Sequence, residues 1–545
     1  MKTNNVASLG QGPGLAWKRA SSSFPPGLAE LQEWTGGKTE PPEPPWHGEV
    51  DFQQWNTIGW GITDDGVLCI KPWTGDVGET GSAITRADVP WYRQQPNINK
   101  VESIGTIVLN EHSAGLFYGC SRLTDLTALA EWNVSNVTIM YSMFYGCSSL
   151  NDLTPLREWN VSNVTDMSSM FSYCSSLTDL DALKDWNVSS VTNTNGMFTG
   201  CSRLTDLSAL ANWDVSNVTR MDSMFYRCSN LTDLSALTEW DVSEVTNMNG
   251  MFAGYSSLND LTPLRDWNVS NVTNMSGMFY GCSNLTDLRG LDAWEVSSVT
   301  NMNGMFYGCS GLTNLRGLEY WDVSEVTNMS GMFYGCSSLN DLIGLEDWNV
   351  SKVESMGSMF NGCSRLIHLD AIRDWEVSEV TNMSSMFYSC SSLTDLSALA
   401  NWDVHNVTSM SGMFYNCSRL TDLSALEDWD VHNVTNMTGM FYGCSDLTDL
   451  TALQNWSVYS VANMNSMFQG CSSLQTIGIP SIANGGQKLA ENAEDAKLTT
   501  VLPSIISEDG SMGPLTWDEL YTEMTTNQDA FLEGTIWVKA EEAAQ

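Results

Sequence analysis

The chain repeats one pattern at a fixed interval of 27 residues. Thirteen tryptophans stand at this interval, from Trp132 to Trp456. Thirteen of the 14 cysteines keep the same interval, from Cys120 to Cys471, and Tyr255 takes the one position of that series without a cysteine. A constant period without insertions is typical of architectures in which each unit stacks on the next. The repeat therefore predicts a long, regular surface, and its first expected use is binding.

The repeat unit from Cys201 to Arg227 indicates what each coil buries. Its apolar residues are mostly three positions apart, with a step of two after Trp213. A helix would alternate steps of three and four, and a half-buried strand would alternate strictly. Steps of three instead predict a coil of short segments and corners, with one apolar residue pointing inward per segment. Stacked coils would bury these residues in one core, with a spacing of about 4.8 Å as between parallel strands.

We expect four segments along the chain. The fold class is a β-rich solenoid: a leucine-rich-repeat-like right-handed coil of about 13 stacked 27-residue repeats, with an N-terminal β cap and a small C-terminal α/β module. The segments are a disordered, proline-rich leader at 1–49, an N-terminal β capping region at 50–119, the solenoid at 120–479, and a C-terminal cap or accessory module at 480–545.

Local signals add detail to the two ends. Asp65-Gly66 between two apolar runs predicts a hairpin. Thr516 and Glu519 match a capping box, which predicts a helix through Met524, and residues 534–540 predict a strand. No apolar run follows the first residues, and no stretch is long enough to cross a membrane. We therefore expect no signal peptide and no membrane insertion.

The net charge of −40 excludes nucleic acid and anionic membranes as expected partners, because like charges repel. Much of this charge lies five residues after each cysteine, in a column that we take as a candidate binding face. Two interpretations stay open: a solvated face that aids solubility, or a groove for a basic protein surface or divalent cations. The candidate residues are Asp125, Asp152, Asp179, Asp206, Asp233, Asp260 and Asp287.

Tyrosines form a second candidate column, directly after the Met-Phe pair of many repeats. They either shield the edge of the core or anchor an interface, a role in which exposed tyrosine is common. The candidate residues are Tyr226, Tyr280, Tyr307 and Tyr334.

Chemistry-bearing motifs are missing from the sequence. The cysteines are too regular for pairwise disulfides and lack zinc-ligand spacing, so we expect free, buried thiols. His405 and His432 lie one period apart. Two interpretations stay open: exposed corner residues that replace serine, or a metal-binding or pH-sensing pair. No serine-nucleophile, phosphate-loop or metalloprotease motif occurs. We expect no catalytic residues, no cofactor, no metal site and no enzyme activity.

The repeat resembles a known family. Residues 241–248 (DVSEVTNM) and 278–283 (MFYGCS) resemble the BspA-like leucine-rich repeat family, in its DUF285 form, over about 120–475. The period here is one residue longer than the common 26-residue form of that repeat. The resemblance implies a bacterial or protist surface or secreted protein, and several members are linked to adhesion to host matrix proteins or cells.

These observations favour a non-enzymatic, adhesin-like protein of the cell surface or extracellular space. Its partner would be a host matrix or cell-surface protein, with a basic surface as one option. Three alternatives remain: a virion receptor-binding or tail-associated protein, a structural spacer, and an ice-binding protein that uses the threonine column from Thr138 to Thr327. The sequence leaves the ligand and the oligomeric state open.

Overall fold

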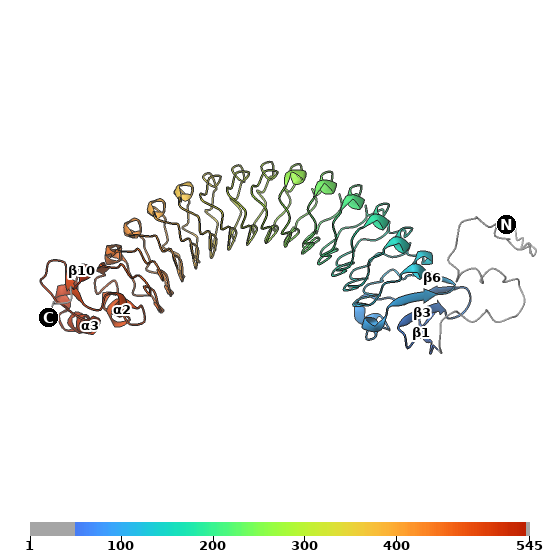
Figure 1. The fold of residues 1–545 in the computed structure, drawn as a ribbon, viewed down its shortest axis with the longest axis horizontal. Coiled ribbons are helices and arrows are strands. Elements are labelled where there is room, and N and C mark those ends of the chain that lie inside the picture. Colours follow the sequence, from blue (N-terminus) through green and yellow to red (C-terminus); the bar gives the residue numbers. More distant parts are fainter. Residues whose placement is uncertain (1–49, 541–545) are drawn as a thin grey trace, which may run out of the picture. The chain divides into compact units, whose positions relative to one another are not determined.

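Successive 27-residue coils lie side by side through the repeat region (Figure 1). The computed structural model describes residues 50–540, so the leader expected at 1–49 lies outside the described residues. Equivalent residues of neighbouring coils form isolated parallel bridges, in a continuous series from His112 and Ile139 to Asn436 and Asn463. The chain is thus a repeat protein whose coils stack in sequence order.

One edge of each coil is a parallel hydrogen-bonded ladder. Alternate N–H groups from Met248 to Gly254 donate to carbonyls of the next coil, from Asn274 to Tyr280, at 2.6–3.0 Å. Two residues of this ladder segment have positive φ, here Gly250 at 61° and Gly254 at 84°. Glycine adopts this conformation without the steric cost that a Cβ brings. The coils bond to one another as parallel strands do. Because the two positive-φ residues bend the segment, no regular strand forms within residues 109–448.

Most coils carry a short 3-10 helix just before the tryptophan. The coils that begin near Leu288, Leu315 and Leu342 have a turn instead, around Gly290, Gly317 and Gly344. The 3-10 helices are η4 (Thr127–Glu131), η5 (Thr154–Leu156), η6 (Asp181–Leu183), η7 (Ser208–Leu210), η8 (Ser235–Leu237), η9 (Thr262–Leu264), η10 (Asp370–Ile372), η11 (Ser397–Leu399), η12 (Ser424–Leu426) and η13 (Thr451–Asn455).

The core consists of columns of equivalent side chains. Each repeat tryptophan is at most 5% exposed. From Trp159 onward, the indole N–H donates to a carbonyl of the preceding coil, as Trp321 does to Leu291 at 2.9 Å. The cysteines are all free and buried, which confirms the sequence expectation. From Cys147 onward, the repeat thiols bond a main-chain carbonyl of the preceding coil, that of Phe117 in the first case.

The coil spacing differs from one column to the next. Neighbouring rings are 6.4–6.5 Å apart in the tryptophan column, as in Trp294 and Trp321. They are only 4.1–4.5 Å apart in the parallel tyrosine stacks, as in Tyr307 and Tyr334. The uniform 4.8 Å spacing assumed from parallel strands is therefore wrong. Bulky indoles fill one side of the coil, whereas glycine and serine draw the ladder side together, so the coils fan apart toward the tryptophans.

Residues before the repeats form two small sheets. The first has the order β1 (Gln53–Trp55), β2 (Ile58–Ile62), β3 (Val67–Pro72) and β5 (Lys100–Ser103). β2 and β3 are antiparallel around Asp65-Gly66, which confirms the predicted hairpin. β4 (Val77–Glu79) pairs in parallel with β6 (Thr106–Val108), and two 3-10 helices, η2 (Arg86–Asp88) and η3 (Gln95–Asn97), connect these strands. Bridges from Lys100 to Asp125 and from Val108 to Asn133 join this region to the first coil.

The region after the last coil is a second mixed structure. Its sheet has the order β7 (Asp449–Leu450), β8 (Thr476–Ile479), β10 (Thr535–Lys539) and β9 (Ile505–Ser507). Three α-helices and a 3-10 helix accompany it: α1 (Gly486–Glu491), α2 (Leu498–Val501), α3 (Trp517–Thr526) and η14 (Gln528–Phe531). Thr516 and Glu519 form the predicted capping box of α3, and β10 confirms the predicted strand.

Candidate binding groove

A groove of about 460 Å³ crosses the ladder side of neighbouring coils. Three of the four candidate tyrosines, Tyr280, Tyr307 and Tyr334, line it together. The full lining is Asn249, Ser276, Gly277, Tyr280, Asn303, Gly304, Tyr307, Ser330, Gly331, Tyr334, Gly357 and Ser358. The groove therefore runs along the stack rather than within a single coil.

The tyrosine wall of the groove is a stack of parallel rings. Tyr280 and Tyr307 are 4.5 Å apart with an interplanar angle of 10°, and Tyr307 and Tyr334 are 4.1 Å apart with an angle of 2°. Tyr280 is 45% exposed, whereas the other two are half-buried. Because each ring covers its neighbour's face, the stack presents ring edges and hydroxyl groups to the groove.

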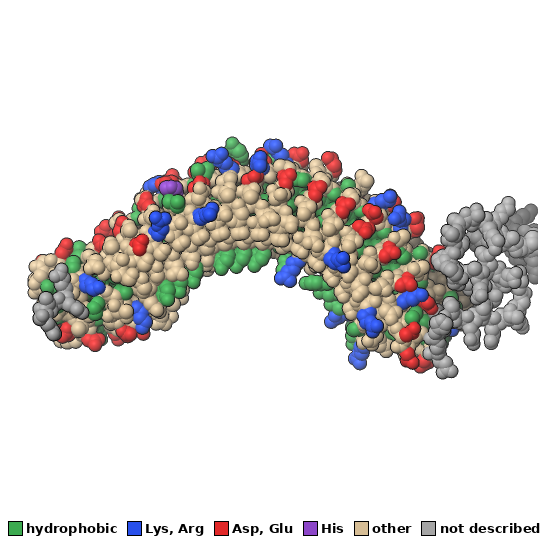
Figure 2. All heavy atoms as spheres, viewed as in Figure 1, with side chains coloured by type: hydrophobic (Ala, Val, Ile, Leu, Met, Phe, Trp, Pro, Cys, Tyr) green, Lys and Arg blue, Asp and Glu red, His purple; other side chains and the backbone are tan. Residues whose placement is uncertain are grey.

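The groove carries no formal charge. Its twelve lining residues are all Asn, Ser, Gly or Tyr. Burial, with the neighbouring hydroxyl of Tyr334 as the next cause, raises the pKa of Tyr307 to about 12. That phenol is therefore neutral at physiological pH, in a protein whose net charge is −40. In the view of Figure 2, acidic side chains gather along one margin of the repeat region and hydrophobic ones along the opposite margin.

The floor of the groove is glycine backbone. Gly277, Gly304 and Gly331 have φ values of 59–61°. Their N–H groups donate to carbonyls of the next coil at 2.8–2.9 Å, so none of them is free for a ligand. The hydrogen-bonding groups that remain belong to side chains, including the carboxamide of the exposed Asn303 and the hydroxyls of the tyrosine stack.

Tyr226 lies outside the groove, two coils before Tyr280. Ala253 takes the tyrosine position between them, and the guanidinium of Arg227 lies 5.2 Å from the Tyr226 ring centre. A second three-ring stack, formed by Tyr388, Tyr415 and Tyr442, follows after Asn361 interrupts the column. The candidate tyrosines thus divide into one that packs with arginine and three that form the groove.

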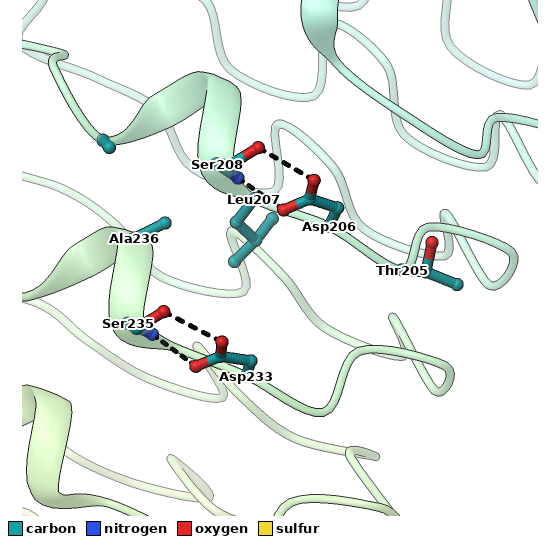
Figure 3. Close-up of a pocket in the computed structure, with 8 residues that line it drawn as sticks. Thr205, Asp206, Leu207, Ser208, Asp233, Ser235 and Ala236 are labelled. Atoms are coloured by element: carbon teal, nitrogen blue, oxygen red, sulfur yellow. Dashed lines mark hydrogen bonds between the residues drawn. The ribbon is translucent and has the colours of Figure 1, made fainter.

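The seven candidate aspartates have a local structural role. Each accepts the backbone N–H of the second residue after it, at 2.8–3.4 Å, as an Asx turn does. Asp206 and Asp233 also accept the hydroxyls of Ser208 and Ser235, at 2.8 and 2.9 Å. Figure 3 shows these paired bonds at the start of two adjacent 3-10 helices, beside a cavity of about 250 Å³.

The structure does not bring the two candidate columns together. The aspartates precede the 3-10 helices or, at Asp287, the turn that replaces one, whereas the tyrosines lie within the ladder segment, and the cavities beside them share no residue. Sequence reasoning missed the serine, asparagine and glycine residues of the groove. A usable signal exists: the position three residues before the tyrosine varies between glycine and serine, and it is glycine in four consecutive coils, from Gly250 to Gly331.

The remaining candidate groups form no further centre. Among residues 50–540, no three His, Cys, Asp or Glu side chains converge so as to hold a metal ion. His405 and His432 each bond an aspartate, Asp403 and Asp430, through Nδ1 at 2.7 Å. These bonds take the place of the bond from a serine hydroxyl to asparagine or aspartate that several other coils form at this corner, as Ser162 does to Asn160 and Ser216 to Asp214. No helix within the described part of the chain is long and apolar enough to cross a bilayer.

Stacked 27-residue coils with aromatic and cysteine columns define the class, a repeat protein with a groove along one face. The profile of the family described as "Mycoplasma protein of unknown function, DUF285" matches residues 111–209, 205–316, 283–395, 311–418 and 394–479. These matches cover more than half of the chain, so the protein belongs to this family, as the resemblance in the sequence predicted.

Two solved structures are similar to the chain. A leucine-rich repeat protein from Eubacterium ventriosum is 17% identical with a TM-score of 0.38, over 74% of this chain and 96% of that one. A leucine-rich cell surface protein from Faecalibacterium prausnitzii is 17% identical with a TM-score of 0.27, over 58% of this chain and 94% of that one. No curated protein sequence matches the chain.

Proposed function

We propose that this chain is a non-enzymatic, adhesin-like interaction protein that binds a protein partner along the groove beside Tyr280, Tyr307 and Tyr334. The observation that carries the proposal is an uncharged, tyrosine-lined groove in a chain of net charge −40. Tyrosine is a favoured anchor of interfaces because it buries a large ring at a small entropic cost and keeps a polar end. The partner is a matrix or cell-surface protein, and the chain itself acts at the cell surface or outside the cell.

The aspartate column is the less favoured binding face. Its carboxylates already accept backbone N–H groups, so the fold explains their recurrence without a ligand. Asn314 takes the same position in one coil and accepts the N–H of Arg316 at 3.2 Å. Charge is therefore not needed for the turn. Substituting Asn for Asp206, Asp233 and Asp260 removes charge while keeping the turns, and partner binding should be unchanged.

Binding of the full chain to purified matrix proteins, measured by biolayer interferometry, tests the proposal. The triple variant Y280S/Y307S/Y334S should weaken binding about tenfold or more. The matched control Y388S/Y415S/Y442S removes the other tyrosine stack and should change the affinity less than about twofold. Equal loss in both variants, or loss only in the aspartate-to-asparagine variant, would refute the groove as the binding face.

Surface location has its own test. Protease treatment of intact source cells should degrade the protein while a cytosolic marker survives. Full protection of the chain in intact cells, with degradation only after lysis, would contradict a surface role.

A further inference from the structure

The glycine floor of the groove is not imposed by the backbone. Ser223 and Ser358 occupy the same repeat position with φ values of 58° and 59°, the conformation that Gly304 has at 60°. A Cβ on Gly304 would meet only the Cβ of Tyr307, at 3.7 Å. The fold therefore accepts serine here, and the consecutive glycines leave open the space that serine side chains would fill.

The groove cannot add a ligand strand to a sheet. Strand addition needs free backbone N–H and C=O groups at a sheet edge. The N–H groups of Gly277, Gly304 and Gly331 are all bonded to the next coil. A polypeptide in this groove must therefore keep a backbone conformation that needs no ladder partner. Polyproline II is such a conformation, because it has no internal hydrogen bonds and its carbonyls stay free.

The tyrosine stack presents donors and ring edges to such carbonyls. Aromatic edges carry partial positive charge and attract oxygen atoms. The three hydroxyl groups lie on rings 4.1–4.5 Å apart and point along the same edge of the stack. The carboxamide of Asn303 provides a further donor. Sugar rings pack best on aromatic faces, and here those faces cover one another at 4.1–4.5 Å.

The spacing of the coils matches the polyproline II repeat. The two steps from Tyr280 to Tyr334 measure 4.5 and 4.1 Å, so two coils advance slightly less than 9 Å on this side. One polyproline II turn of three residues advances about 9.3 Å. Every third ligand residue would thus meet an equivalent position two coils further on. A strand advances about 6.7 Å per two residues, which matches neither one coil nor two.

We propose that the groove receives a proline-rich segment of the partner protein in the polyproline II conformation. The segment is neutral or basic, because the groove is uncharged and the field of the acidic chain repels anionic ligands. This inference rests on the proposed function, since it names the chemical class of the bound segment.

The probe is a dye-labelled decaproline peptide with blocked ends, titrated with the full chain and followed by fluorescence anisotropy. We expect saturable binding with a Kd below about 1 mM. The variant G277S/G304S/G331S fills the floor with a side chain that the same backbone already carries elsewhere, and it should weaken binding about tenfold or more. A length-matched glycine-serine peptide should not bind. Thermal unfolding of the variant checks that it folds.

The inference fails if decaproline does not bind below about 1 mM. It also fails if the filled variant binds decaproline as tightly as the natural chain. Binding of a neutral oligosaccharide, cellohexaose, that is lost in the filled variant while decaproline does not bind would assign the groove to glycans instead. Should matrix-protein capture depend on the tyrosines while decaproline does not bind, the proposed function stands and only this inference is overturned.

Discussion

The tryptophan and tyrosine columns share one period but lie on different sides of the same coils and differ in burial. The indoles are buried, 6.4–6.5 Å apart, and bond the preceding coil. The groove tyrosines are 4.1–4.5 Å apart, partly exposed, and stack on one another. Recurrence alone therefore does not distinguish a structural column from a binding column. The distinction comes from which side of the coil the column occupies and from what satisfies its polar atoms.

The largest expected effect is the loss of stability at high pH that the buried cysteine column causes, because the contributions of its thiols add along the stack. Burial raises the pKa of Cys201, Cys363 and Cys417 to about 12 from 9.0. A folded-state pKa above the unfolded value means that stability is fully present below about pH 9 and is lost as the pH rises toward 12. The urea midpoint should fall sharply between about pH 9 and about pH 11. An unchanged midpoint, or rapid reaction of native thiols with Ellman's reagent at neutral pH, would contradict the buried column.

Single substitutions in the tryptophan and tyrosine columns should differ clearly in how much they lower the free energy of unfolding. Trp321→Ala removes a buried ring and its bond to Leu291, and it should lower the free energy of unfolding by about 3–5 kcal/mol. Tyr307→Ala removes a half-buried ring and should cost about 1 kcal/mol, while partner binding weakens, though less than in the triple tyrosine variant. Urea unfolding and interferometry on both variants measure the contrast. Similar stability losses would mean that the tyrosines also hold the fold.

Tyr255 is the one tyrosine of the cysteine column, and it allows a buried tyrosine to be compared with the groove tyrosine Tyr307. Its ring is fully buried, and its hydroxyl is the one buried side-chain polar atom without a partner in the described chain. Tyr255→Phe should raise the free energy of unfolding by about 1–3 kcal/mol, because an unsatisfied hydroxyl is removed. The matched change Tyr307→Phe deletes a hydroxyl of a partly exposed ring, which water can satisfy, and should give no gain. Destabilisation by Tyr255→Phe would show that the hydroxyl is satisfied.

Substitutions in the aspartate column should change stability least. Asp206→Ala deletes the bonds to the N–H and hydroxyl of Ser208 and should cost about 1 kcal/mol. Asp206→Asn keeps an acceptor for the N–H, as Asn314 does in its own coil, and should be close to neutral. Thermal unfolding of both variants separates the contribution of the turn hydrogen bonds from that of the negative charge. Equal destabilisation would indicate that the negative charge itself matters.

Particular residues show how far the sequence reached. The period from Trp132 to Trp456, the free cysteines, the hairpin at Asp65-Gly66 and the helix after Thr516 were all predictable, because each depends on local patterns or on a fixed repeat. The tyrosines were predicted as a column, but the groove was not. It depends on glycines three residues before Tyr280, Tyr307 and Tyr334, and their importance appears only once the ladder side is known.

A strict period is enough to place equivalent residues of successive coils one above another, because the apolar residues have no other way to be buried. The residue types in each column then decide which columns are interior, since Trp, Cys, Leu and Met present little polar surface. Three further features became visible only in the folded molecule: how far apart the coils lie on each side, that the aspartates bond their own turns, and that three tyrosines meet a glycine floor. These depend on distances between side chains of different coils, which a linear pattern does not contain.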